Sequence, residues 1–155
     1  MTKKRLLIVA HAPSPNTATL RDAILRGATQ LDLDEVETVV RGPFDTGPED
    51  VLAAQAVILG TTENLGYMSG ALKDFFDRIY YPCLDRTQGL PYALMIRAGH
   101  DGTGTRRAVE TIVTGLRWRA VYGPLVCRGD FQDAFVAQCE ELGGTVAASL
   151  EAGII

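Results

Sequence analysis

The sequence lacks the features that mark nucleic-acid-binding and membrane proteins. Its one cluster of basic residues is Lys3-Lys4-Arg5, and its net charge is −4, so no basic groove for a nucleic acid is predicted. The first apolar run, residues 6–10, is too short for a membrane span or a signal peptide before His11 and Pro13 interrupt it. We therefore expect a cytoplasmic protein with neither a nucleic-acid nor a membrane partner.

Cysteine is also scarce and has no informative spacing. Cys83, Cys127 and Cys139 form an odd, widely separated set that fits neither a disulfide framework nor a metal site. We expect three reduced thiols and no metal. The phosphate-binding pattern GxxxxGK[ST] is missing as well, which disfavours a nucleoside triphosphate held with magnesium.

No repeat, linker or low-complexity tract divides the chain, so residues 1–155 are expected to form one domain. A hydrophobic content of 46% is enough for one sizeable core. Apolar runs that fit buried parallel strands occur at residues 6–10, 56–59, 92–96 and 121–127, the last interrupted by Gly123-Pro124. Residues 35–40 alternate less cleanly but end in Thr38-Val39-Val40, a plausible second strand. Alternation of these runs with helical patterns predicts a three-layer, doubly wound α/β fold with strand order 2-1-3-4-5.

The helical patterns follow the spacing i, i+3, i+4, i+7 between these strands. The first places Leu20, Ala23, Ile24, Gly27 and Leu31 on one face. A short helix is expected at Pro48, and a longer one from Ser69 or Gly70 until Pro82 ends it. Further patterns carry Val109, Ile112, Val113 and Leu116, and then Phe135, Cys139, Leu142, Val146 and Leu150. In the last helix, Gly143-Gly144 predicts either a break or a site of close packing.

Ligands of such sheets bind beyond the carboxyl ends of the strands, where three loops of this chain converge. The first loop, HAPSPNT, joins a strand to a helix start and offers Ser14, Asn16 and Thr17. Free N–H groups and hydroxyls at a helix N-terminus favour a phosphate dianion. Ser14 or Asn16 could instead simply cap the helix.

The second and third loops are rich in glycine. The second, residues 61–70, is expected to be irregular, and Gly66 and Gly70 would let the backbone approach a ligand closely. In the third, AGHDGTGT, the glycines form only a weak and misplaced dinucleotide fingerprint. His100 and Asp101 fit an exposed turn as well as a ligand contact.

HAPSPNT after the first strand, GTTENLGYMSGALKDFFDR after the third and the glycine-rich loop after the fourth together resemble the flavodoxin-like superfamily. The middle motif looks closest to the NAD(P)H-dependent FMN reductases and quinone reductases. The resemblance implies that the FMN phosphate lies on Ser14, Asn16 and Thr17. It implies that the isoalloxazine lies on Thr61, Thr62, Glu63, Asn64, Leu65, Gly66 and Tyr67, and its pyrimidine edge on Gly99, His100, Asp101, Gly102 and Gly104. No catalytic side chain is implied, because the chemistry resides on the flavin.

The family also suggests how the ring would be tuned, and the chain departs from it in two places. N–H groups around Gly102, Thr103 and Gly104 would stabilise the charge that reduction places on the ring. Pro15 stands where the flavodoxin phosphate loop usually has glycine, and Tyr67 is the one aromatic residue available to cover the ring.

Three functions remain open. The resemblance favours an enzyme that passes electrons from NADH or NADPH through FMN to a small acceptor such as a quinone or a flavin. A flavodoxin-type carrier between protein partners is the alternative, but such carriers tend to be strongly acidic and to shield the ring with aromatic residues. A domain that has lost its cofactor is the third. Aromatic surface near Tyr80-Tyr81 would suit a homodimer contact.

Overall fold

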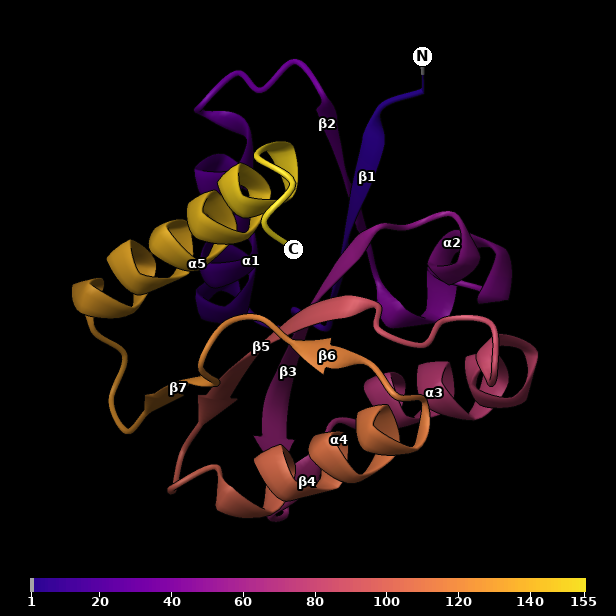
Figure 1. Ribbon diagram of the computed structural model, residues 1–155. Helices are drawn as coiled ribbons and strands as arrows, with labels where there is room; N and C mark the ends of the chain where they lie inside the picture. The colour runs from indigo at the N-terminus through magenta and orange to yellow at the C-terminus, as the bar shows by residue number, and fades with distance from the viewer. Residues whose placement is uncertain (1) are drawn as a thin grey trace.

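The computed structural model describes residues 2–155, and its strands form a seven-stranded sheet (Figure 1). The strands are β1 (Lys4–Ala10), β2 (Val36–Arg41), β3 (Ala56–Asn64), β4 (Tyr67–Met68), β5 (Pro91–Ala98), β6 (Arg119–Ala120) and β7 (Leu125–Arg128). The helices are α1 (Pro15–Thr29), η1 (Pro43–Asp45, a 3₁₀ turn), α2 (Pro48–Leu52), α3 (Gly70–Cys83), α4 (Thr103–Gly115) and α5 (Asp133–Glu151).

The parallel strands run in the order β2-β1-β3-β5-β6, which confirms the predicted order 2-1-3-4-5. Of the fifth strand predicted at residues 121–127, residues 125–127 belong to β7, whereas residues 121–124 are not strand and the short β6 precedes them. β6 pairs with β5 at Pro91 and Tyr92, and β7 pairs with β5 at residues 95–98. The segment between β6 and β7 contains Gly123-Pro124. Proline cannot donate to the ladder, so the interruption falls where the sequence predicted it.

Each face of the sheet carries its own hydrophobic core, because side chains alternate along buried strands. Leu7 and Val9 of β1 pack with residues of α2, α3 and α4, whereas Leu6 and Ile8 pack with residues of α1 and α5. Figure 1 shows α1 and α5 together on one side of the sheet and α3 and α4 on the other. The three predicted layers are therefore present.

Glycines set the close approach of α1 and α5. A Cβ on Gly143 would collide with the carbonyl of Ile24, and one on Gly27 would collide with the carbonyl of Glu140. α5 continues unbroken through Gly143-Gly144. Of the two outcomes left open by the sequence, close packing is the one that occurs.

Two predicted helix features are wrong. Leu31 does not belong to the buried face of α1, because the helix ends at Thr29 and Leu31 is 50% exposed. Pro82 does not end α3, which continues to Cys83. The helix ends one residue after Pro82, and the N–H of Leu84 still bonds the carbonyl of Tyr80 at 2.9 Å.

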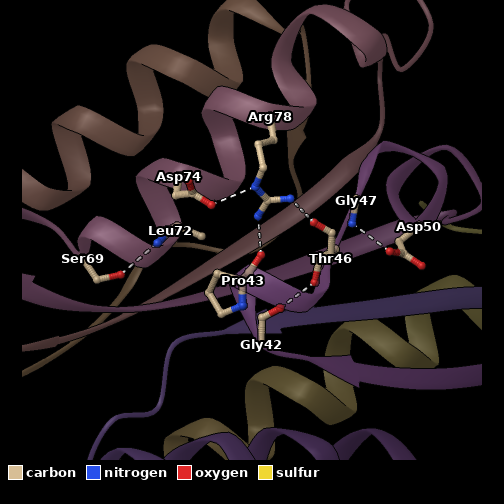
Figure 2. Close-up of polar contacts among 9 residues, drawn as sticks. All are labelled: Gly42, Pro43, Thr46, Gly47, Asp50, Ser69, Leu72, Asp74 and Arg78. Carbon is tan, nitrogen blue, oxygen red and sulfur yellow. Dashed lines mark hydrogen bonds and ion pairs between the residues drawn. The ribbon is translucent and has the colours of Figure 1, made fainter.

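A single arginine fixes the segment after β2 against α3. Figure 2 shows the Arg78 guanidinium between the Asp74 carboxylate and the carbonyls of Pro43 and Thr46, at 2.8, 2.7 and 2.7 Å. The segment covers the flank of α3 and leads into α2, which is short as predicted. Within residues 2–155, no helix has the length and apolarity needed to cross a membrane.

Candidate functional site

The segments that follow β1, β3 and β5 meet at one edge of the sheet. These three strands are parallel neighbours, so their carboxyl ends lie side by side. The N–H of His11 bonds the carbonyl of Gly60 at 2.9 Å and links the ends of β1 and β3. The bond uses only the backbone of His11; partial burial of its side chain lowers the pKa of the imidazole.

The first loop closes on itself in a capping box. The N–H of Thr17 donates to Ser14 Oγ at 3.2 Å, and the N–H of Ser14 donates to Thr17 Oγ1 at 2.9 Å. The capping role of Ser14 is thereby confirmed. Ser14 is partly exposed, Asn16 is exposed and Thr17 is buried, and the first-turn N–H of Asn16 has no partner within the helix. The phosphate role of these three residues stays a prediction.

The loop predicted after the third strand is not irregular. β3 extends to Asn64 and pairs with β4 as an antiparallel hairpin, with Glu63 opposite Met68 and Asn64 opposite Tyr67. Leu65 and Gly66 form the two-residue turn with φ of 54° and 76°. Positive φ at both positions is characteristic of a type I′ turn, whose twist suits a hairpin.

The side chains at the tip of this hairpin are exposed. Leu65 is fully exposed and Tyr67 is 41% exposed, whereas Met68 at the base is buried. Leucine is unfavourable in the left-handed region, and it gains no burial here. Neither local propensity nor packing explains Leu65 at this position, which makes it a candidate for contact with a ligand.

Thr61 and Thr62 lie at the base of the hairpin and differ in their surroundings. Thr61 is 1% exposed, and its Oγ1 accepts the N–H of Ser69 at 3.0 Å. Ser69 Oγ then accepts the N–H of Leu72 at 3.1 Å and caps α3. Thr62 is partly exposed, and its hydroxyl bonds Asn64 Oδ1 at 3.0 Å. Thr61 thus acts by holding the start of α3 in place, while Thr62 and Asn64 form part of the accessible surface.

The hairpin and the loop after β5 are joined by Glu63. Its carboxylate accepts the N–H of His100 at 2.9 Å and the N–H of Gly102 at 2.8 Å. The N–H of Thr103 donates to Asp101 Oδ1 at 3.0 Å, and this bond lowers the pKa of the Asp101 carboxyl. Two carboxylates thus already accept from the N–H groups of Gly102 and Thr103. The role of the N–H groups of Gly102, Thr103 and Gly104 toward the ring stays a prediction.

Two further contacts complete the junction. Thr105 Oγ1 donates to the carbonyl of Tyr67 at 2.9 Å, and the carbonyl of Gly66 packs directly on Gly104, where a Cβ would collide with it. Gly99, His100 and Asp101 are exposed beside this junction. Sequence reasoning did not identify Thr105 or the capping role of Ser69. A serine before a helical pattern does signal a cap, but nothing in the sequence points to Thr105.

The three cysteines are free thiols buried away from the exposed surface of these loops. Cys83 lies at the far end of α3, and burial raises the pKa of its thiol. The predicted residues of the second and third loops are brought together, and those of the first loop lie at the end of the neighbouring strand.

Comparison with known proteins supports the fold. A flavodoxin from Aquifex aeolicus is 26% identical over 112 residues, which is 72% of this chain. The chain spans 60% of the length of that relative. No family model matches the chain.

Solved structures resemble it over nearly the whole chain. A flavodoxin from the domain Archaea has a TM-score of 0.80 at 18% identity, covering 95% of this chain and 99% of its own. The two-electron reduced flavodoxin of Megasphaera elsdenii has a TM-score of 0.76 at 16% identity, covering 92% and 98%. A WrbA-like flavodoxin from Agrobacterium tumefaciens has a TM-score of 0.73 at 13% identity, covering 98% and 99%. The chain therefore has a flavodoxin-like fold.

Proposed function

We propose that this protein binds FMN and uses it to pass electrons from NADH or NADPH to a small acceptor such as a quinone or a free flavin. The observation that carries the proposal is the convergence of the capped helix start, the exposed hairpin tip and the loop after β5 at one edge of a flavodoxin-like sheet. In such sheets this edge is where ligands bind.

The first loop suits the phosphate. The N-terminus of α1 supplies the dipole and the first-turn N–H groups that favour an anion. Ser14 Oγ accepts the N–H of Thr17 and lies 2.9 Å from Thr17 Oγ1, so its proton would turn from that hydroxyl to a phosphate oxygen when the anion binds. No positive side chain is needed for a dianion held in this way.

The second and third loops suit the ring. Leu65 and Tyr67 offer apolar surface. At Gly66 and Gly99 the space beside the backbone is open, because a Cβ on either glycine would meet no atom within 4 Å, so a flat ligand can lie directly against the backbone there. FMN, when bound, supplies the hydride and electron chemistry. The chain's own part is to hold the ring and to set its electrostatic surroundings.

An electron carrier is the second candidate. The similarity of this chain to three flavodoxins favours that role. Against it stand the modest net charge of −4 and the presence of one tyrosine, instead of several aromatic residues, at the predicted ring site.

The first experiment tests flavin binding. Purified protein should be yellow or should quench the fluorescence of added FMN, and failure to do either would overturn the proposal. Changing Ser14 and Thr17 to Ala should weaken FMN much more than riboflavin, because riboflavin has no phosphate. Loss of the helix cap alone would weaken both flavins equally, so the ratio of the two dissociation constants separates a phosphate role from a structural one.

The second experiment separates the enzyme from the carrier. Anaerobic mixing of the FMN-loaded protein with NADPH or NADH should bleach the flavin absorbance within seconds if the protein is a reductase. Absence of bleaching with both donors, together with reduction in two separate one-electron steps by dithionite, would favour the carrier.

A further inference from the structure

We propose that Glu63 is a positioning residue that sets the geometry and the charge of the flavin site by tying the hairpin to the loop after β5. The inference rests on the proposed function, since it assigns a role toward bound FMN. It concerns one side chain that belongs to β3 and accepts two backbone N–H groups from a segment about 40 residues further along the chain.

The geometry of the bond is specific. Glu63 Oε1 accepts from His100 and Oε2 from Gly102, so each carboxylate oxygen has its own donor. Gly102 is buried and adopts φ of 71°, and a Cβ there would lie 2.8 Å from Val126 Cγ1. Only glycine suits this turn. The backbone is thus shaped so that its two N–H groups meet one carboxylate.

Glu63 is also the charged link between two surfaces that would face the ring. On the hairpin side it stands opposite Met68, next to the turn that exposes Leu65. On the other side it holds the loop that exposes Gly99, His100 and Asp101. The remaining links are neutral: the Thr105 hydroxyl and the packing of Gly66 on Gly104. Movement of either surface must stretch the bonds to Glu63.

The same carboxylate has an electrostatic consequence. It occupies N–H groups that would otherwise stabilise an anion, and it brings a negative charge to the edge of the site. A negative charge beside the ring opposes the charge that reduction adds. Glu63 should therefore lower the reduction potential of bound FMN while holding the site in shape.

The first test measures the tie itself, in protein free of flavin. Glu63→Gln keeps the shape of the side chain, but its amide can accept from one N–H group only and turns a donor toward the other. Amide exchange at His100 or Gly102 should become about tenfold faster or more, as expected for a lost charge-assisted hydrogen bond. Asp101→Asn removes a carboxylate from the same loop that bonds only the nearby Thr103, and Glu110→Gln removes one from the exposed pair with Arg106 on α4. Protection of His100 and Gly102 should be unchanged in both controls.

The second test measures the effect on flavin. Because the tie acts on the ring site, E63Q should weaken FMN and riboflavin by the same factor, unlike the Ser14 and Thr17 variants, and should raise the reduction potential of bound FMN. Unchanged exchange in E63Q would overturn the tie. Faster exchange with unaltered flavin affinity and potential would overturn the positioning role. If the native protein binds no FMN, the proposed function fails, and the exchange data still decide whether Glu63 couples the loops.

Discussion

Replacement of Leu65 by Asn should stabilise the protein and impair the site. Leu65 adopts φ of 54° and is fully exposed, so its side chain contributes no burial in the folded protein. An ordinary residue in the left-handed region costs about 1–2 kcal/mol, and Asn pays clearly less. Asn followed by Gly is also the preferred pair for a type I′ turn. We expect the free energy of unfolding to rise by about 0.5–1 kcal/mol.

The same substitution should weaken FMN. Loss of an apolar contact worth about 1 kcal/mol corresponds to roughly a fivefold increase in Kd. Arg117→Asn is the matched control, because Arg117 has φ of 61° and follows the far end of α4. It should raise stability through the same relief of a left-handed backbone, since its exposed pair with Asp85 at 3.9 Å contributes little, and it should leave FMN affinity unchanged. Urea unfolding and FMN fluorescence titration give both quantities. If L65N were less stable than the native protein, or bound FMN equally well, a functional cause for Leu65 would be refuted.

Three further substitutions test the packing of the hairpin on Gly104, the bonds of Arg78 to the segment after β2, and the effect of pH. Gly104→Ala should lower the free energy of unfolding, measured in urea, by about 1–3 kcal/mol, because the added methyl group overpacks against the hairpin. Gly70→Ala is the control. Its methyl group would meet no atom within 4 Å and lies in the first turn of α3, so this change should be neutral or stabilising. Arg78→Met should lower the free energy of unfolding by about 2 kcal/mol, because the carbonyls of Pro43 and Thr46 lose their donor. Lys73→Met is the control: it breaks an exposed ion pair and should change stability little in thermal unfolding. Burial lowers the pKa of His11 below its ordinary 6.5, so the unfolded chain takes up the proton first. The free energy of unfolding should therefore fall slightly as pH drops from about 7 to about 5.5. Urea unfolding measured across this pH range should show a smaller fall for His11→Gln, which cannot take up the proton.

The fold was predictable because its signals are local and strong. Continuous apolar runs mark β1, β3 and β5 as strands buried on both faces, and the helical patterns between them give parallel crossovers. The extension of β3 was not predictable. Residues 61–64 are polar and lack alternation, and Leu-Gly is not the usual pair for a hairpin turn. This hairpin forms because tertiary contacts at its base and tip compensate for weak local preference.

The site could be predicted to the level of loops but not of individual contacts. Ser14 is a helix cap by local rules, and the structure agrees. The bonds of Glu63 to His100 and Gly102 join positions 37 and 39 residues apart, which no local rule connects. The carboxylates that accept from the N–H groups of Gly102 and Thr103 at the start of α4 were not predictable for the same reason. A helix start has unpaired donors, but the sequence does not show which distant carboxylate will reach them.

The glycines of α5 show the same limit from another side. Gly143 has a clear cost inside a helix, so its presence predicts either a break or a packing demand. Choosing between them requires knowledge that α1 lies against α5 with Gly27 facing it, and that pairing follows only from the folded sheet.

The charges beside the hairpin bear on the choice between enzyme and carrier. α4 packs against the hairpin through Gly104 and Thr105, and its next residues are the exposed Arg106 and Arg107. With Thr103 and Glu110 they line a shallow concave surface of about 250 Å³. Two arginines next to the proposed ring site fit poorly with a carrier that docks through a strongly acidic face. They are compatible with a donor such as NADH or NADPH, whose phosphates are anionic and whose reactive ring must reach the flavin. Arg106 is, however, paired with Glu110 at 3.2 Å, and the carboxylates of Glu63 and Asp101 lie at the same edge of the sheet. The charge around the site is therefore mixed, and the anaerobic reaction with NADH or NADPH, not the charge, decides between the reductase and the carrier.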